Sequence, residues 1–477
     1  MAMDAEKTVR LTVWIPVAAL ALAVPAYLSR QLWFDEALTV LNFACLDSPA
    51  DIYRAYVIPN NHILFSIILH YWLRLQPAWC APDLWLRLPS LFSAVALLWY
   101  LGKRFRRMCG AFPLMFALTS LAVSPPFLVY ATAVRGYMLG ALFSAVAAGT
   151  AAEFAASGRI RPFVEYFLAS VAAVLTVPSD LAALAGAVLF ALPLCGAEFW
   201  KKRRFYALAL VPVAAMAVAY LPIWRRFVRV AQLGEGWHDR WSSLAAVGLA
   251  LASAFGVLLL MIPAEWARIF RRGRWRQLWR AVIWLLPFPA AFVFAVAPFP
   301  RVYFPLFPLL ALTIALALRN CVMKRRGPFS DALRVRLGIV GAVILLSLCP
   351  WHQTPVRKTL SPRVGGELGD DFFYGYYLRG EHTPLAVAEE LRKLSPGAVY
   401  FSFLSDPWAN MFYHLTGGGS AEYLFDGPRG EVPTLPVGAV AVLRRDETPE
   451  PLEKRFSRRL RPVAATPACR IFTVEAP

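Results

Sequence analysis

Repeated apolar runs, each long enough to cross the hydrocarbon core of a membrane as a helix, constrain this chain most. The first run, residues 11–29, carries no charged side chain, and a span needs about 20 such residues. Across the 477 residues, 58% are hydrophobic and only 17% are charged, which excludes an ordinary soluble domain of this length. The chain is therefore predicted to be an α-helical, polytopic membrane protein.

The basic clusters predict how these spans are oriented. Lys and Arg are enriched in cytoplasmic loops, and the strong clusters lie at residues 103–107, 201–204, 271–280 and 324–326. With the amino terminus inside, these clusters fall on the cytoplasmic side only if the short apolar run 62–75 stays at the interface, because a full crossing there would place all of them outside. We then expect roughly eleven spans in one membrane domain over residues 1–350, with an outer loop over residues 30–83. The net charge of +19 is that of loops facing anionic lipid and does not indicate nucleic acid.

An acidic pair, Asp35-Glu36, follows the first apolar run within a few residues. Ionisable groups at a membrane boundary are candidates for function, because holding them there costs free energy. The alternative is that both are solvated interfacial acids. With the orientation above, the pair lies on the outer face, and His62 and Asp180 lie on the same side.

Two isolated arginines also fall on the outer face. Arg135 is the only charged residue between positions 111 and 152, and Arg301 lies in a turn with two prolines between apolar runs. Each alone fits an interface anchor. Together with the acidic pair they favour one outward pocket for a substrate that carries a phosphate and a hydroxyl to be activated.

The character of the chain changes after residue 350, where a polar segment with many Gly and Pro residues begins. We predict a small extracytoplasmic α/β domain over residues 351–477, with helices at 384–394 and 408–415 and strands at 398–404, 437–443 and 471–474. The seven cysteines form no metal-ligand spacing. Whether Cys45 and Cys80 pair in an oxidising compartment stays open.

Several motifs occur in an order that resembles the GT-C superfamily of polyprenyl-phosphate-sugar-dependent glycosyltransferases. The closest likeness is to the branch of protein O-mannosyltransferases and lipid A aminoarabinose transferases, over about residues 10–320. The matching segments are Asp35-Glu36, Asn60-Asn61-His62-Ile63-Leu64-Phe65, Leu69-His70-Tyr71-Trp72, Arg87-Leu88-Pro89-Ser90, Ser124-Pro125-Pro126-Phe127 with Tyr130 and Arg135-Gly136-Tyr137, and Arg301-Val302-Tyr303-Phe304-Pro305.

The resemblance implies roles for these residues. Asp35 would be the general base, and Glu36 would orient the acceptor or help to hold a divalent cation. The donor's lipid phosphate and sugar would be bound by His62, Arg135, Tyr137, Arg301 and Tyr303, with a structural hydrogen bond as the alternative role of His62. The sequence departs from the pattern at two places: the paired prolines before His62 are missing, and Asp180 occupies a turn where relatives carry a His-Tyr pair. We interpret Asp180 as a turn residue, with a replacement ligand or a substrate contact as the alternatives.

The resulting hypothesis is an inverting glycosyltransferase of the bacterial cytoplasmic (inner) membrane. It would move a sugar from a polyprenyl-phosphate donor to an envelope glycan, lipid or protein acceptor on the outer face. No Gly-rich nucleotide cradle is present near the site, which argues against a nucleotide-sugar donor. The alternatives are a transporter or flippase of a lipid-linked sugar, which would favour internal repeats and mid-span acids, and a ligase or polymerase of envelope polysaccharide.

Overall fold

The structure is a computed structural model, and it forms two compact units. It describes residues 5–28, 32, 34–56, 61–196, 203–232, 240–274, 277–287, 300–320, 384–394, 396–401, 422–425, 434–445, 447–466 and 469–477. The first unit comprises Met1–Ser29, His62–Phe65 and Gln76–Gly375, and the second comprises Arg30–Asn61, Ser66–Leu75 and Tyr376–Pro477. The domain boundary predicted after residue 350 lies outside the described residues.

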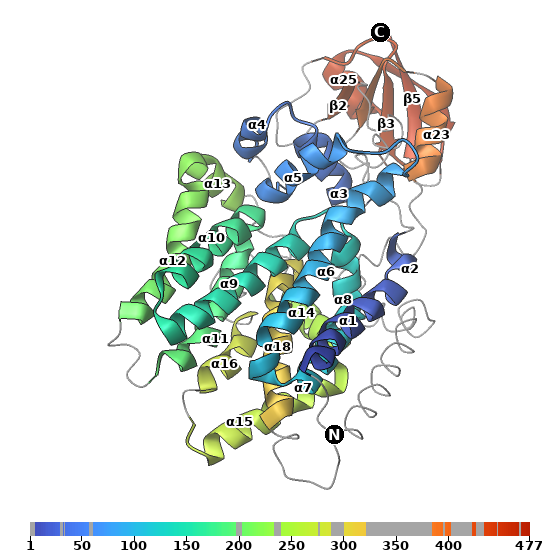
Figure 1. Ribbon diagram of the computed structural model, residues 1–477. Coiled ribbons are helices and arrows are strands. Elements are labelled where there is room, and N and C mark those ends of the chain that lie inside the picture. The colour runs from blue at the N-terminus through green and yellow to red at the C-terminus, as the bar shows by residue number, and fades with distance from the viewer. Residues whose placement is uncertain are drawn as a thin grey trace. The chain divides into compact units, whose positions relative to one another are not determined.

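The first unit is a helical bundle (Figure 1). Its longer helices are α1 (Ala5–Ala23), α6 (Pro82–Cys109), α7 (Ala111–Ala122), α8 (Pro125–Thr132), α9 (Tyr137–Ser157), α10 (Ile160–Thr176), α11 (Leu181–Ala191), α12 (Arg203–Tyr220), α13 (Trp224–Gln232), α14 (Arg240–Phe255), α15 (Met261–Arg271) and α18 (Phe307–Leu318). Short 3₁₀ segments, among them η2 (Pro178–Asp180) and η9 (Pro300–Leu306), connect or extend them.

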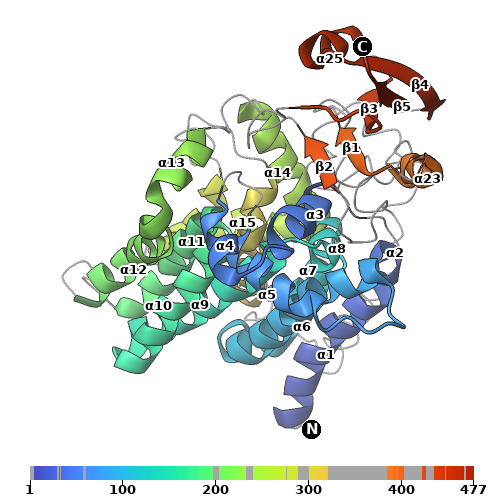
Figure 2. The same ribbon diagram turned by 90° about the horizontal axis from the view of Figure 1, so that it is seen from above.

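Helix α9 lies at the centre of this bundle. It packs between α6 and α10, with α12 on the far side of α10, in both views (Figures 1 and 2). Helix α11, η9 and α18 also pack against it. The sequence of α9 explains this position, since 10 of its 21 residues are Ala or Gly, whose small size allows neighbouring helices to approach closely.

Backbone chemistry sets the helix boundaries near the centre of the bundle. Helices α7 and α8 are bent by 66°, and the break falls at Ser124, which precedes Pro125 and has the extended conformation that a residue before proline favours. Helix α9 ends at Gly158, which adopts φ +70° and closes the helix in the left-handed conformation.

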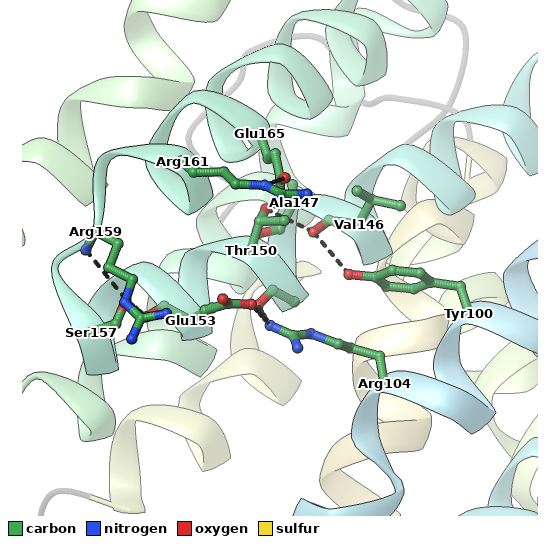
Figure 3. A network of polar contacts seen from close by, with 11 residues as sticks. Tyr100, Arg104, Val146, Ala147, Thr150, Glu153, Ser157, Arg159, Arg161 and Glu165 are labelled. Atoms are coloured by element: carbon green, nitrogen blue, oxygen red, sulfur yellow. Dashed lines mark hydrogen bonds and ion pairs between the residues drawn. The ribbon is translucent and has the colours of Figure 1, made fainter. Parts of the chain in front are cut away.

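A polar network joins α6 to the C-terminal half of α9 (Figure 3). Arg104 on α6 forms an ion pair with Glu153 and donates a hydrogen bond to the Gly149 carbonyl at 3.2 Å. Tyr100 donates to the Val146 carbonyl at 3.4 Å. Each of these polar groups has a partner within the protein. The side chains of Arg104 and Glu153 are also 38% and 39% exposed, so solvent reaches the network.

The described residues contain six helices long and apolar enough to span a membrane, or seven if the bent pair α7–α8 counts as one span. The prediction of a multi-span helical membrane protein is confirmed. The predicted number of eleven stays a prediction, because the last predicted span and parts of others lie outside the described residues. The predicted interfacial run corresponds to α5 (Ile63–Leu73), an apolar helix of 11 residues, too short to cross alone.

The N-terminal part of the second unit contains α3 (Phe34–Thr39), a π-helical turn η1 (Val40–Ala44) and α4 (Pro49–Arg54). The Asn61 side chain stabilises this segment: it donates to the Ile52 carbonyl at 2.8 Å and accepts from the Ser66 hydroxyl at 3.1 Å. Cys45 is a free thiol, as is Cys80 of the first unit, so the structure contains no disulfide between them.

The C-terminal part of the second unit is a five-stranded mixed sheet in the order β2-β1-β3-β5-β4. Its elements are α23 (Pro384–Leu394), β1 (Ala398–Phe401), β2 (Glu422–Phe425), β3 (Val440–Arg444), α25 (Glu450–Phe456), β4 (Arg459–Ala465) and β5 (Cys469–Glu475). Strand β1 is parallel to β2 and β3, whereas β5 is antiparallel to β3 and β4. The small C-terminal α/β fold is confirmed; the helix predicted at 408–415 lies outside the described residues.

Candidate functional site

A histidine and an arginine meet at the N-terminal end of α9. His62 is 1% exposed and Arg135 is 2% exposed. The backbone N–H of Gly136 donates to His62 Nδ1 at 2.8 Å, and His62 Nε2 lies 3.2 Å from Arg135 Nη2. Gly136 is required for this approach, because a Cβ there would lie 2.9 Å from His62 Nδ1 and 2.7 Å from Thr176 Cγ2.

The turn that carries Arg135 is held by α6. Arg87 Nη1 donates to the Thr132 carbonyl at 2.5 Å, and Ser90 Oγ donates to the Ala133 carbonyl at 2.5 Å and lies 3.3 Å from the Arg135 carbonyl. Thr132 is the last residue of α8, and Ala133 and Arg135 follow it; carbonyls at a helix end need partners from outside the helix. The Arg87-Leu88-Pro89-Ser90 motif therefore fixes the backbone from which Arg135 projects.

A line of aromatic contacts connects His62 to η9. The His62 ring meets the Tyr137 ring edge to face at 4.8 Å, Tyr137 meets Tyr130 at 5.2 Å, and Tyr130 meets Phe304 at 4.5 Å. The Arg135 guanidinium lies 5.7 Å from the centre of the Tyr137 ring. Tyr303 and Arg301 lie beside Phe304 on η9, at 3% and 6% exposure, so the bundle brings all five predicted donor-binding residues into its interior.

The surroundings of His62 fix its protonation state. His62 precedes α5 and lies outside the spanning helices. Burial, followed by the charges of Arg135 and Arg301, lowers the pKa of the imidazole well below its ordinary value, so the ring is neutral at neutral pH. Because Nδ1 accepts from Gly136, the ring hydrogen resides on Nε2.

This tautomer makes the His62–Arg135 contact a meeting of two donors. Guanidinium nitrogens donate and never accept, so Nε2–H and Nη2–H are directed at the same region. A third group with acceptor oxygens resolves that conflict. A phosphate suits both donors, since it offers several acceptors and a negative charge to the guanidinium.

Asp180 lies deeper in the bundle than its sequence position suggests. It is 0% exposed, and neither carboxylate oxygen has a hydrogen-bond partner among the described residues. Its side chain caps no helix, and Oδ2 is directed at Gly140, where an added Cβ would overlap it. The interpretation of Asp180 as only a turn residue is therefore incomplete: the residue does lie in a 3₁₀ turn, but its carboxylate is a buried group facing α9.

The predicted acidic pair lies on α3, in the second unit. Asp35 is 9% exposed and Glu36 is 4% exposed, and the Thr39 hydroxyl donates to the Asp35 carbonyl at 2.8 Å. Consecutive helical residues point in different directions, which suits two distinct roles. Within the described residues no three His, Cys, Asp or Glu side chains gather to hold a metal, and the divalent cation stays a prediction.

Sequence reasoning missed the roles of three residues near the His62–Arg135 pair. Arg87 and Ser90 belong to a recognised motif, but their carbonyl partners lie more than 40 positions along the chain, so no local pattern revealed them. Tyr130 was part of a motif and turned out to link Tyr137 to Phe304. The available signal was that Arg87 and Ser90 are polar residues in a mostly apolar span, since such residues need partners.

The fold matches solved structures of ArnT. The structure aligns with ArnT from Cupriavidus metallidurans, both bound to undecaprenyl phosphate and in the apo state, with a TM-score of 0.55 and 16% identity in each case. The alignment covers 96% of this chain and 97% of the other. No protein-family model and no curated protein matches the sequence. The chain has an ArnT-like fold, so the resemblance predicted from sequence is confirmed at the level of the fold.

Proposed function

We propose that this chain is an inverting glycosyltransferase that uses a polyprenyl-phosphate sugar as donor. The observation that carries the proposal is the buried pair of donors formed by His62 Nε2–H and the Arg135 guanidinium, on a fold that ArnT shares and in which ArnT binds undecaprenyl phosphate. The acceptor hydroxyl belongs to an envelope glycan, lipid or protein. The reaction takes place on the outer face of a bacterial cytoplasmic membrane.

The chemistry asks the protein to stabilise a departing phosphate. The acceptor oxygen forms a bond to the anomeric carbon while the bond from that carbon to the phosphate oxygen breaks with its electron pair. The lipid phosphate gains negative charge as it leaves. Arg135, Arg301 and His62 lie in the low-dielectric interior, where such donors stabilise developing charge strongly. Tyr137 and Tyr303 complete the donor site.

The other half of the reaction is assigned to α3. Asp35 takes the proton of the acceptor hydroxyl as that oxygen attacks, and Glu36 orients the acceptor. A positioned base of this kind typically contributes about 10²–10⁴-fold in rate. Attack on the face opposite the leaving phosphate inverts the anomeric configuration.

The test is the release of lipid phosphate from labelled donors. Purified protein is incubated with undecaprenyl-phosphate sugars that differ in the sugar, with an envelope extract as the acceptor source. The wild type should release undecaprenyl phosphate from one donor, and Asp35→Asn should abolish release. The matched control is Asp47→Asn, an exposed carboxylate in the same loop, which should leave release unchanged.

Two outcomes contradict the proposal. Equal release by wild type and Asp35→Asn removes Asp35 from the mechanism. Labelled lipid that changes leaflet in vesicles without release of undecaprenyl phosphate shows transport instead of transfer.

A further inference from the structure

We infer that Asp180 recognises the sugar of the donor by accepting hydrogen bonds from its hydroxyl groups. The inference rests on the proposed function and assigns a specificity role inside the same bundle. Three observations carry it. The Asp180 carboxyl group has no partner among the described residues, its contact on α9 lies one helical turn from the contact of His62, and two hydroxyl groups in the same region also lack partners there.

The carboxylate is buried at a cost that the protein itself does not offset. Asp180 is 0% exposed, and both of its side-chain oxygens lack a hydrogen-bond partner among the described residues. A buried polar group without a partner destabilises the fold. Such a group is retained where it has a partner in the working state, and a ligand is the partner that the folded chain alone does not supply.

Helix α9 relates Asp180 to the phosphate-binding pair. Gly136 contacts His62 and Gly140 contacts Asp180. Positions four apart lie on the same helix face, separated by about 6 Å along the axis. A sugar attached to a phosphate held by His62 and Arg135 therefore has a carboxylate acceptor within reach, one turn deeper along α9.

The surroundings of Asp180 extend the polar strip. Ser144 follows Gly140 by one further turn on the same face, is 0% exposed, and its hydroxyl has no partner among the residues that the structure describes. Next to Asp180 on η2, the buried hydroxyl oxygen of Ser179 also has no hydrogen-bond partner among the described residues. Segment η2 packs against η9, which carries Arg301 and Tyr303, so the strip belongs to the donor site.

Hydrogen-bonding capacity decides which part of the donor Asp180 meets. The oxygens of its carboxyl group accept hydrogen bonds from the hydroxyl groups of a sugar, whereas a phosphate linked to lipid and sugar offers only acceptors. Arg135 and Arg301 supply the donors that the phosphate needs, and Asp180 supplies the acceptor that a polyhydroxylated ring needs. A site built to hydrogen-bond a substrate hydroxyl also rejects analogues that lack it, so Asp180 is a specificity-determining residue.

The experiment separates sugar recognition from phosphate binding. Wild type, Asp180→Asn and the control Glu153→Gln, which changes the ion-paired carboxylate at the other end of α9, are compared in two assays. The first measures binding of undecaprenyl phosphate, which has no sugar. The second measures kcat/KM for release from the undecaprenyl-phosphate sugar that the wild type uses, and from its monodeoxy analogues.

We expect Asp180→Asn to lower kcat/KM about 10- to 100-fold, with the affinity for undecaprenyl phosphate unchanged. One monodeoxy analogue should be a poor substrate for the wild type, and Asp180→Asn should not distinguish it from the full sugar. Glu153→Gln should behave as the wild type. Asp180→Asn with normal kcat/KM, or with equal losses for lipid phosphate and for sugar donor, overturns the inference and leaves the proposed function standing.

A second pair of variants tests the same contact from the opposite side. Gly140 and Gly149 both lie on α9. Gly140→Ala places a methyl group against the Asp180 carboxylate, and Gly149→Ala places one against the Tyr100 hydroxyl of α6. Both perturb packing to a similar degree, but only Gly140→Ala should lower kcat/KM for the sugar donor. Equal losses in both show a packing effect. A wild type that binds undecaprenyl phosphate but releases sugar from no donor overturns the proposed function itself.

Discussion

The two ends of helix α9 both carry buried or half-buried polar side chains, but only the N-terminal end faces a buried carboxyl group that has no hydrogen-bond partner among the described residues. At the C-terminal end, Arg104 pairs with Glu153 and bonds the Gly149 carbonyl, and both side chains are more than one third exposed (Figure 3). At the N-terminal end, His62 and Arg135 present donors to each other, and within the described part of the chain no donor reaches the Asp180 oxygens.

The difference separates a structural network from a binding site. Buried polar groups in native proteins are nearly always paired, and a region that violates this rule is expected to be functional. A glycine admits the polar group in both places: Gly149 admits Tyr100, and Gly140 admits Asp180. Close packing alone therefore does not distinguish the two ends, whereas the presence or absence of hydrogen-bond partners among the described residues does.

The arginines test the comparison most severely. Arg135→Ala removes a buried donor from the leaving phosphate and should lower turnover about 10²–10³-fold. Arg104→Ala removes one half of a half-exposed ion pair and should change turnover less than about twofold. Turnover is measured as release of undecaprenyl phosphate, with the unfolding temperature as a control for folding. Similar losses in turnover for both variants would make the two ends equivalent.

The α6 serines sharpen the comparison by testing how the active end is positioned. Ser90→Ala frees the carbonyls of Ala133 and Arg135 and should weaken binding of undecaprenyl phosphate about tenfold, because a misplaced guanidinium loses its alignment. Ser93→Ala is the matched control, since the Ser93 hydroxyl donates to the Pro89 carbonyl one turn earlier on its own helix. An unchanged affinity in Ser90→Ala would show that Arg135 holds its position without α6.

The sequence predicted the class of fold and the side of the membrane on which the site residues lie. Hydropathy and basic clusters report on membrane insertion, which is local along the chain, so they placed His62, Arg135 and Arg301 on one side. The contacts of Asp180 with Gly140 and of Ser90 with Ala133 join residues about 40 positions apart, and only helix packing determines them. Strand β4 was missed because it is an edge strand with mostly exposed side chains, which weakens the alternating pattern.

Stability should change in opposite directions at the two ends. Asp180→Ala removes a buried acid without a partner and should raise the unfolding midpoint by a few degrees, equivalent to about 1–3 kcal/mol. Glu153→Gln removes a half-exposed ion pair and should lower stability by no more than about 1 kcal/mol. The measurement is thermal unfolding in detergent at a fixed scan rate. A lower midpoint for Asp180→Ala would mean that the carboxylate stabilises the fold.

The smallest expected effect is a pH dependence confined to the N-terminal end of α9. The pKa of His62 is lowered in the folded protein and is about 6.5 in the unfolded chain, so the unfolded state binds more protons below pH 6.5 or so. Stability is therefore fully present above that pH and falls as the pH decreases toward the folded pKa. His62→Gln removes the titration, so the stability of the wild type relative to this variant should decline on acidification, measured as unfolding midpoints between pH 7.5 and about 5. Arg104→Ala, which leaves His62 in place, is the control and should follow the wild type across the same pH range. If the difference in unfolding midpoint between wild type and His62→Gln did not change with pH, the imidazole would take up its proton as readily in the folded state as in the unfolded one.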